Sequence, residues 1–130
     1  MKNHGESVVG SWEVVDDNSH DIFLATYTGG PLEGTVNFTS PNNATTLSHG
    51  QWKRTGECTF ADTDTALLRG ADGKANATIT FQADIEVAHG GNDATFAFDF
   101  AVKNLDGTSV TNGSSTAKGT RINVVSRVTS

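Results

Sequence analysis

A tryptophan and an arginine, two positions apart, are the residues of this sequence best suited to hold a small molecule. Trp52 and Arg54 fall on the same face of any β-strand that contains them, because side chains alternate across a strand. On that face the indole would stack on a flat ligand, and the guanidinium would hold a carboxylate, phenolate or enolate oxygen. The alternative role is structural, with a core indole covered by the arginine stem.

Tyr27 and a set of phenylalanines complete the candidate site. The phenol of Tyr27 is a candidate proton donor or acceptor, and Tyr27 and Arg54 form the catalytic pair that we expect if the protein is an enzyme. We expect the ligand-binding lining to include Trp52 and four phenylalanines, Phe60, Phe81, Phe96 and Phe98. These residues predict a cavity that holds an apolar or aromatic small molecule.

The histidines do not point to a metal site. None of His4, His20, His49 and His89 lies at a His-x-His or His-x-x-x-His spacing, so no metal ligand set is predicted. Nucleophile elbows, phosphate-binding loops and dinucleotide fingerprints do not occur in the sequence, so no cofactor is expected.

The carboxylates are interpreted as surface groups. Asp62 and Asp64 interrupt a strand-like run, which we interpret as an exposed kink near a rim, with a bulge that aims one carboxylate into the cavity as the alternative. Asp84, Glu86 and Asp99 fall on the polar phase of their strands and predict an acidic outer wall.

Charge and hydropathy exclude several classes of partner. The 130 residues carry a net charge of −6 and contain no run of lysines and arginines, so nucleic acid is not expected as a partner. No apolar stretch approaches the roughly 18 residues of a membrane-spanning helix, and the first residues lack the apolar segment of a signal peptide. We therefore expect a soluble chain, with its compartment and oligomeric state left open.

Alternating apolar and polar residues predict a protein built from β-strands. From Ala75 to Val87 every odd position is apolar and every even position polar, and the pattern resumes on Phe96, Phe98, Phe100 and Val102 after a turn at 89–93. These two segments predict a hairpin. Six further strands are predicted at Ser11–Asp17, Ile22–Thr28, Leu32–Thr39, Thr46–Arg54, Cys58–Leu68 and Ser115–Val124.

Eight short strands in succession favour an up-and-down meander. Tight turns join most of them, and only one long connection is expected, from Asn104 to Ser114. Closure of the meander into an antiparallel barrel would remove both exposed edges, whereas a two-sheet β-sandwich is the alternative. No linker or repeat interrupts the chain, so residues 1–130 are expected to form a single all-β domain.

The two ends of the predicted meander carry a family resemblance. The segment Gly10-Ser11-Trp12, taken with Gly119-Thr120-Arg121, resembles the lipocalin, or calycin, arrangement. That resemblance implies an eight-stranded barrel in which the arginine of the last strand lies against the tryptophan of the first and bonds to nearby backbone carbonyls. The segment His49–Gly56 is similar to a motif of small bacterial lipocalin-like barrels. Neither resemblance implies a particular ligand.

Three hypotheses for function follow from this fold and these residues. The first is a binding module whose cavity holds one small apolar or aromatic molecule. The second is a cofactor-independent isomerase or cyclase, a kind of enzyme found in the allene oxide cyclase and dirigent group, which the chain resembles in general architecture. The third is a barrel filled by its own phenylalanines, with a structural role. An ionisable side chain that points into the cavity would distinguish the second hypothesis from the first.

Overall fold

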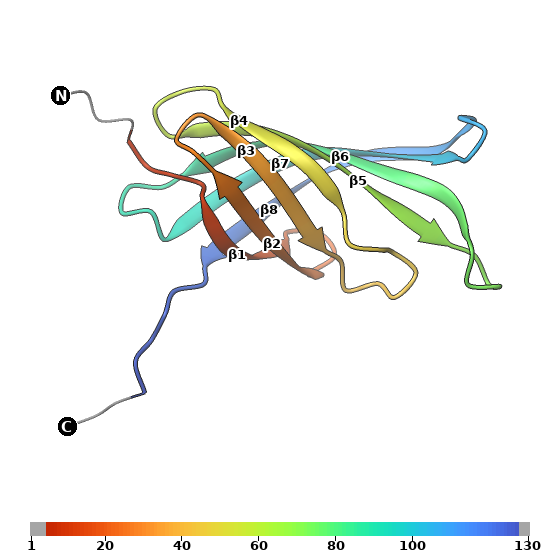
Figure 1. Cartoon of the computed structure of the whole chain (residues 1–130), viewed down its shortest axis with the longest axis horizontal. Helices are drawn as coiled ribbons and strands as arrows, with labels where there is room; N and C mark the ends of the chain where they lie inside the picture. Colours follow the sequence, from red (N-terminus) through yellow and green to blue (C-terminus); the bar gives the residue numbers. More distant parts are fainter. Residues whose placement is uncertain (1–4, 128–130) are drawn as a thin grey trace.

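A computed structural model describes residues 5–127. His4, which the sequence analysis assigned to no metal site, lies outside the described residues. Within that range the chain folds into strands joined by short connections, and no helix is present (Figure 1). No described segment is therefore a helix long and apolar enough to cross a membrane. The strands are β1 (Gly10–Asp16), β2 (Ile22–Gly29), β3 (Glu33–Thr39), β4 (His49–Arg54), β5 (Thr59–Arg69), β6 (Ala75–Val87), β7 (Asp93–Asn104) and β8 (Ser109–Arg121).

The strands close into a barrel in which each strand pairs with its neighbours in sequence. The order is β1 to β8, and β8 returns to pair with β1, so that Trp12 lies opposite Arg121. Every pairing is antiparallel. The up-and-down barrel is thus confirmed over the sandwich, and the pairing of β1 with β8 covers the two outer edges of the meander where these strands meet.

The predicted hairpin of β6 and β7 forms the longest regular part of the wall. β6 has the bounds predicted from its alternation, and Ile85 lies directly opposite Phe96 on the inner face. Both side chains are buried, while Asp84 and Glu86, which flank Ile85 in β6, are exposed on the outside. The alternation of apolar and polar residues therefore determines which face of the wall is exposed to solvent, as expected for a half-buried strand.

The connection predicted between Asn104 and Ser114 is wrong. β7 continues to Asn104, a tight turn follows, and β8 begins at Ser109. Backbone bonds from Asn104 N to Thr108 O and from Gly107 N to Asn104 O close the turn, and Gly107 has a positive φ of 91°. The sequence of early β8 gave no strand signal because it is polar on both faces, and its one large apolar residue, Val110, is exposed.

The longer connection lies instead between β3 and β4, over residues 40–48. The prediction started β4 at Thr46, but the strand begins at His49. Thr45 makes an isolated bridge to Leu68, and the backbone N–H of Thr46 donates to Leu67 O at 3.0 Å. These bonds hold the connection against the end of β5, at one rim of the barrel.

Trp12 and Arg121 close the opposite end of the barrel. The guanidinium of Arg121 lies 4.3 Å from the centre of the Trp12 ring and donates to the backbone oxygens of Ser7, Val9 and Gly91 at 2.6 Å each. Trp12 Nε1 donates to Val8 O at 2.9 Å. The arrangement implied by the resemblance is therefore present, and it fixes this end as the floor of the barrel.

Candidate functional site

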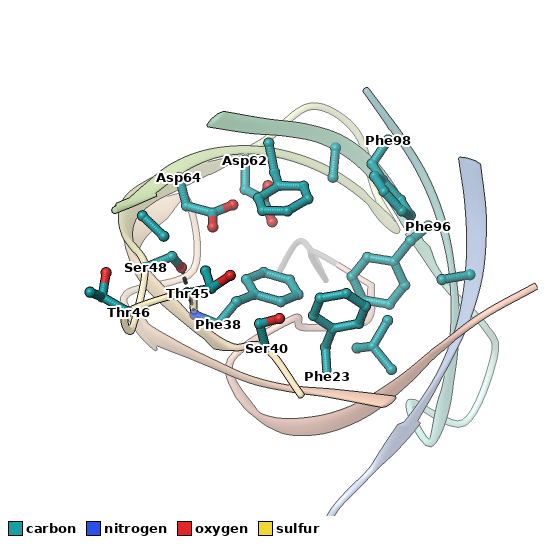
Figure 2. Close-up of a pocket in the computed structure, with 15 residues that line it drawn as sticks. Phe23, Phe38, Ser40, Thr45, Thr46, Ser48, Asp62, Asp64, Phe96 and Phe98 are labelled. Carbon is teal, nitrogen blue, oxygen red and sulfur yellow. Dashed lines mark hydrogen bonds between the residues drawn. The ribbon is translucent and has the colours of Figure 1, made fainter. Parts of the chain in front are cut away.

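A cavity opens at the end of the barrel opposite the Trp12–Arg121 floor. Its empty space, including the open mouth, is about 570 Å³, and the part that the centre of a water molecule can reach is about 40 Å³. Side chains of seven strands and of the β3–β4 connection surround it (Figure 2). The lining residues are Val14, Phe23, Phe38, Ser40, Thr45, Thr46, Ser48, Asp62, Asp64, Ala66, Phe81, Ala83, Phe96, Phe98 and Ala117.

Aromatic rings form much of the apolar wall of the cavity. Phe81 meets Phe23 edge-on with ring centres 6.5 Å apart, and meets Phe98 in the same manner at 6.0 Å. Figure 2 shows Phe23, Phe96 and Phe98 on the side away from the acidic residues. Such edge-to-face contacts hold the rings in fixed positions, so this wall offers an ordered apolar surface to a ligand.

Asp62 and Asp64 form the opposite wall, and the prediction that they make an exposed kink is wrong. Their side chains are only 4% and 1% exposed, and both line the cavity. β5 is regular here, with Asp62 opposite Ala83 and Asp64 opposite Phe81, so no bulge turns them inward. They point inward because they share the inner phase of β5 with Phe60 and Ala66.

The two carboxyls have few hydrogen-bond partners. Tyr27 Oη donates to Asp62 Oδ2 at 2.5 Å. Asp62 Oδ1 and both oxygens of Asp64 accept no hydrogen bond from the described residues 5–127. The Ser48 hydroxyl lies near Asp64, and its oxygen accepts a 2.8 Å bond from the backbone N–H of Phe38. Buried polar atoms without partners are rare in proteins and often mark a binding site.

Burial raises the pKa of both carboxyls. Removal from water raises the pKa of Asp62 to about 7, with the charge of Asp64 adding to the rise and the Tyr27 hydroxyl opposing it. Burial likewise raises the pKa of Asp64 to about 6, and the nearby Ser48 hydroxyl offsets part of that rise. Both groups therefore change their charge close to neutral pH, where ordinary aspartates stay ionised.

Hydroxyl groups lie beside the acidic wall. The β3–β4 connection contributes Thr45, Thr46 and Ser48 to the same side of the cavity as Asp64, and Ser40 nearer to Phe23 (Figure 2). The cavity is thus divided between a polar side formed by β5 with this connection and an aromatic side formed by β2, β6 and β7. A ligand with one polar and one apolar end would match that division.

Three of the predicted lining residues surround the cavity and two do not. Phe81, Phe96 and Phe98 line it, whereas Trp52 and Phe60 are packed together nearer the floor, with ring centres 5.7 Å apart. Trp52 Nε1 donates to Thr28 O at 2.9 Å. These two side chains therefore belong to the packed lower half of the barrel.

The predicted catalytic residues are also placed below the cavity. The Arg54 guanidinium lies 4.7 Å from the centre of the Phe60 ring, and it donates to backbone oxygens that include Pro31 O at 2.8 Å and Glu6 O at 3.0 Å. Tyr27 is buried and faces Asp62 from beneath. Arg54 does not line the cavity, whereas Tyr27 contacts the site through Asp62.

Comparison with known proteins assigns this chain to no family. The chain matches no protein-family model, no curated protein and no solved structure. Within residues 5–127 no group of three or more His, Cys, Asp and Glu side chains is arranged to hold a metal ion.

Proposed function

We propose that this protein is a lipocalin-like binding module that holds one small apolar or aromatic molecule at the open end of its barrel. The observation that carries the proposal is the cavity itself, with the ordered rings of Phe23, Phe81 and Phe98 along one side. An eight-stranded barrel is just wide enough for a single small ligand. The Arg121–Trp12 floor supports the lipocalin-like assignment, because it closes one end and leaves the other for entry.

The floor and the cavity are separate parts of the molecule. Trp12, Tyr27 and Phe60 are fully buried in the lower half, where they supply stable packing. The lining rings Phe23 and Phe98 are only partly buried. Since incompletely buried rings lose less water on folding, they retain apolar surface that a ligand can cover.

Two measurements test this proposal. Native mass spectrometry of the purified protein is expected to show a bound small molecule, or an empty barrel that takes one up. Titration with the neutral fluorescent dye N-phenylnaphthylamine is then expected to give saturable binding with one site per chain. A protein that neither carries nor takes up any molecule would favour the filled-barrel hypothesis instead.

Replacement of one of two alanines of β5 by leucine tests where the dye binds. Ala66→Leu adds side-chain volume inside the cavity, since Ala66 lines it. Ala61→Leu adds the same volume on the same strand, but residue 61 lies on the outward phase of β5. We expect Ala66→Leu to weaken dye binding and Ala61→Leu to leave it unchanged. Equal effects of the two substitutions would place the dye outside the cavity.

A second candidate function is a cofactor-independent isomerase or cyclase. The observation that favours it is Asp62, a cavity-lining carboxyl with a pKa of about 7 that accepts a hydrogen bond from Tyr27. A carboxyl with such a pKa can take up and release a proton at neutral pH. The compound found by native mass spectrometry would be incubated with the protein and analysed by chromatography for an isomer of equal mass. Conversion that Asp62→Asn abolishes would support the enzyme.

A further inference from the structure

The acidic side of the cavity carries more negative charge than the described structure neutralises. Three buried carboxyl oxygens, Asp62 Oδ1 and both of Asp64, accept no hydrogen bond within residues 5–127. The donors beside them, the Ser48 hydroxyl near Asp64 and the Ala83 backbone N–H near Asp62, are both neutral. Figure 2 shows the carboxyl groups of Asp62 and Asp64 directed into the cavity. The residues that line it include no lysine, arginine or histidine. A buried carboxylate without a countercharge is unfavourable, so this wall is suited to receive a cation or a strong hydrogen-bond donor.

An ammonium group has the chemistry that these oxygens lack. It carries three N–H donors and no acceptor, and it forms charge-assisted hydrogen bonds with carboxylates. A carboxylate or phosphate would instead be repelled by Asp62 and Asp64. A fatty acid, a frequent occupant of apolar cavities, would therefore place its charged end against like charges.

We propose that the cavity selects a primary amine attached to a small apolar or aromatic body. The ammonium lies against the carboxyls of Asp64 and Asp62, and the hydroxyl of Ser48 lies beside it. The body lies across the cavity against the rings of Phe23, Phe81 and Phe98. This inference rests on the proposed binding function, and it adds the class of ligand.

The other groups that face these carboxyls do not change this charge balance. Tyr27 on β2 donates a neutral hydroxyl to Asp62 from below. Asp84 on β6 is exposed on the outer face, and its negative charge adds to the repulsion at Asp62 rather than neutralising it. The β3–β4 connection contributes only serine and threonine side chains, and β7 and β8 contribute phenylalanines and an alanine.

The selectivity is tested with three compounds that share a phenyl ring. Phenethylamine is a cation, phenethyl alcohol is neutral and phenylacetate is an anion at about pH 8, so they differ mainly in the charge of their polar end. Each is used to displace N-phenylnaphthylamine from the protein. We expect the amine to compete at least about tenfold better than the alcohol, because hydrogen bonds to charged groups are the stronger kind. Phenylacetate is expected to be the weakest competitor.

Substitution of one carboxyl identifies the source of the preference. Asp64→Asn keeps the shape of the side chain and removes its charge, and it is expected to reduce the preference for amine over alcohol to about threefold or less while leaving alcohol binding in place. Asp84→Asn removes the same charge from the outer face, and is expected to keep the preference. Thermal melting of each variant checks that it is folded.

The outcomes separate this inference from the function on which it rests. Failure of the dye to bind would refute the binding module itself. Dye binding with an amine no better than the alcohol, or with phenylacetate as the best competitor, would refute amine selectivity alone. A preference for the amine that survives in Asp64→Asn, or is lost in Asp84→Asn, would show that general surface charge causes it and would also overturn the inference.

Discussion

The buried carboxyl pair is expected to make the folded protein less stable as the pH rises from about 4 to about 8. Asp62 and Asp64 have pKa values of about 7 and about 6 in the folded state, both raised from 3.8 chiefly by burial. A carboxyl with a raised folded-state pKa binds its proton more tightly in the folded chain than in the unfolded chain. Its stabilising contribution is therefore complete below the unfolded pKa and is lost as the pH rises through the folded pKa.

The size of the effect follows from these pKa values. A pKa difference of one corresponds to about 1.4 kcal/mol, so differences of about 3 for Asp62 and about 2 for Asp64 give upper limits of about 4 and 3 kcal/mol. Part of the rise at Asp62 is repulsion by ionised Asp64. We therefore expect a combined loss of about 3–6 kcal/mol, a large fraction of the roughly 5–15 kcal/mol that stabilises a typical domain.

Three carboxyls with lowered pKa values act outside this pH window. Asp16, Asp17 and Asp106 have pKa values lowered from 3.8, so the stability that they contribute is lost only as the pH falls below about 4. For Asp16, hydrogen bonds from the backbone of Ser19 and Asn18 and from Ser115 outweigh the opposing effect of burial. None of these three carboxyls therefore adds to the change that Asp62 and Asp64 cause between about pH 4 and 8.

Urea unfolding at a series of pH values measures this loss. Trp12 and Trp52 are both buried, so their fluorescence reports unfolding, and the linear dependence on urea gives the free energy at each pH. Asp64→Asn should remove about 2–3 kcal/mol of the pH dependence. Asp106→Asn should leave the change between about pH 4 and 8 in place, because the lowered pKa of Asp106 confines its effect to lower pH. A wild-type stability that is constant or rises between about pH 5 and 8 would refute the placement of two unpaired carboxyls inside the barrel.

Three further substitutions test the floor and the site. Arg121→Ala should lower the free energy of unfolding by about 2–4 kcal/mol, measured with urea, because it uncovers Trp12 and removes the bonds to three backbone oxygens. Arg54→Ala should lower stability by about 1–3 kcal/mol but leave dye affinity unchanged, since its bonds go to backbone oxygens below the cavity. Tyr27→Phe should raise the pKa of Asp62 further, because it removes the hydroxyl that donates to this carboxyl, and nuclear magnetic resonance titration would detect the change. The same substitution should lower the free energy of unfolding by about 1–3 kcal/mol at about pH 8, where Asp62 is ionised, and by less at about pH 5.

The fold could be predicted from the sequence where one face of a strand is apolar. β6 alternates over its full length and was predicted with its correct bounds, and the Trp12–Arg121 pairing confirmed the closure of the barrel. The first half of β8 was missed because it projects beyond β1 and pairs there only with β7. A strand segment that covers no core needs no apolar face, so its sequence shows no alternation of apolar and polar residues.

The site could be predicted only in part, for a related reason. Phe81 and Phe98 were assigned to the cavity because apolar residues on the inner phase are expected there. The same phase, followed along β5 from Phe60, reaches Asp62 and Asp64, but charged residues usually indicate exposure. The signal was therefore present in the alternation. What the sequence could not supply was how far along the barrel each inward residue lies: Trp52 packs against Phe60 and bonds to Thr28 O, outside the cavity lining.

The pH dependence of stability also distinguishes what fills the cavity. A ligand that binds only the folded state stabilises it by about 2.7 kcal/mol at a concentration of one hundred times its dissociation constant. A neutral occupant such as phenethyl alcohol should raise stability by a similar amount at about pH 5 and 8, because it does not select a charge state. Phenethylamine should raise it more at about pH 8, since an ammonium beside Asp64 favours the ionised carboxyl and lowers its pKa. Saturation with the amine should therefore flatten the decline that the empty protein shows. Equal stabilisation by both compounds at both pH values would mean that the carboxyls do not contact the ligand.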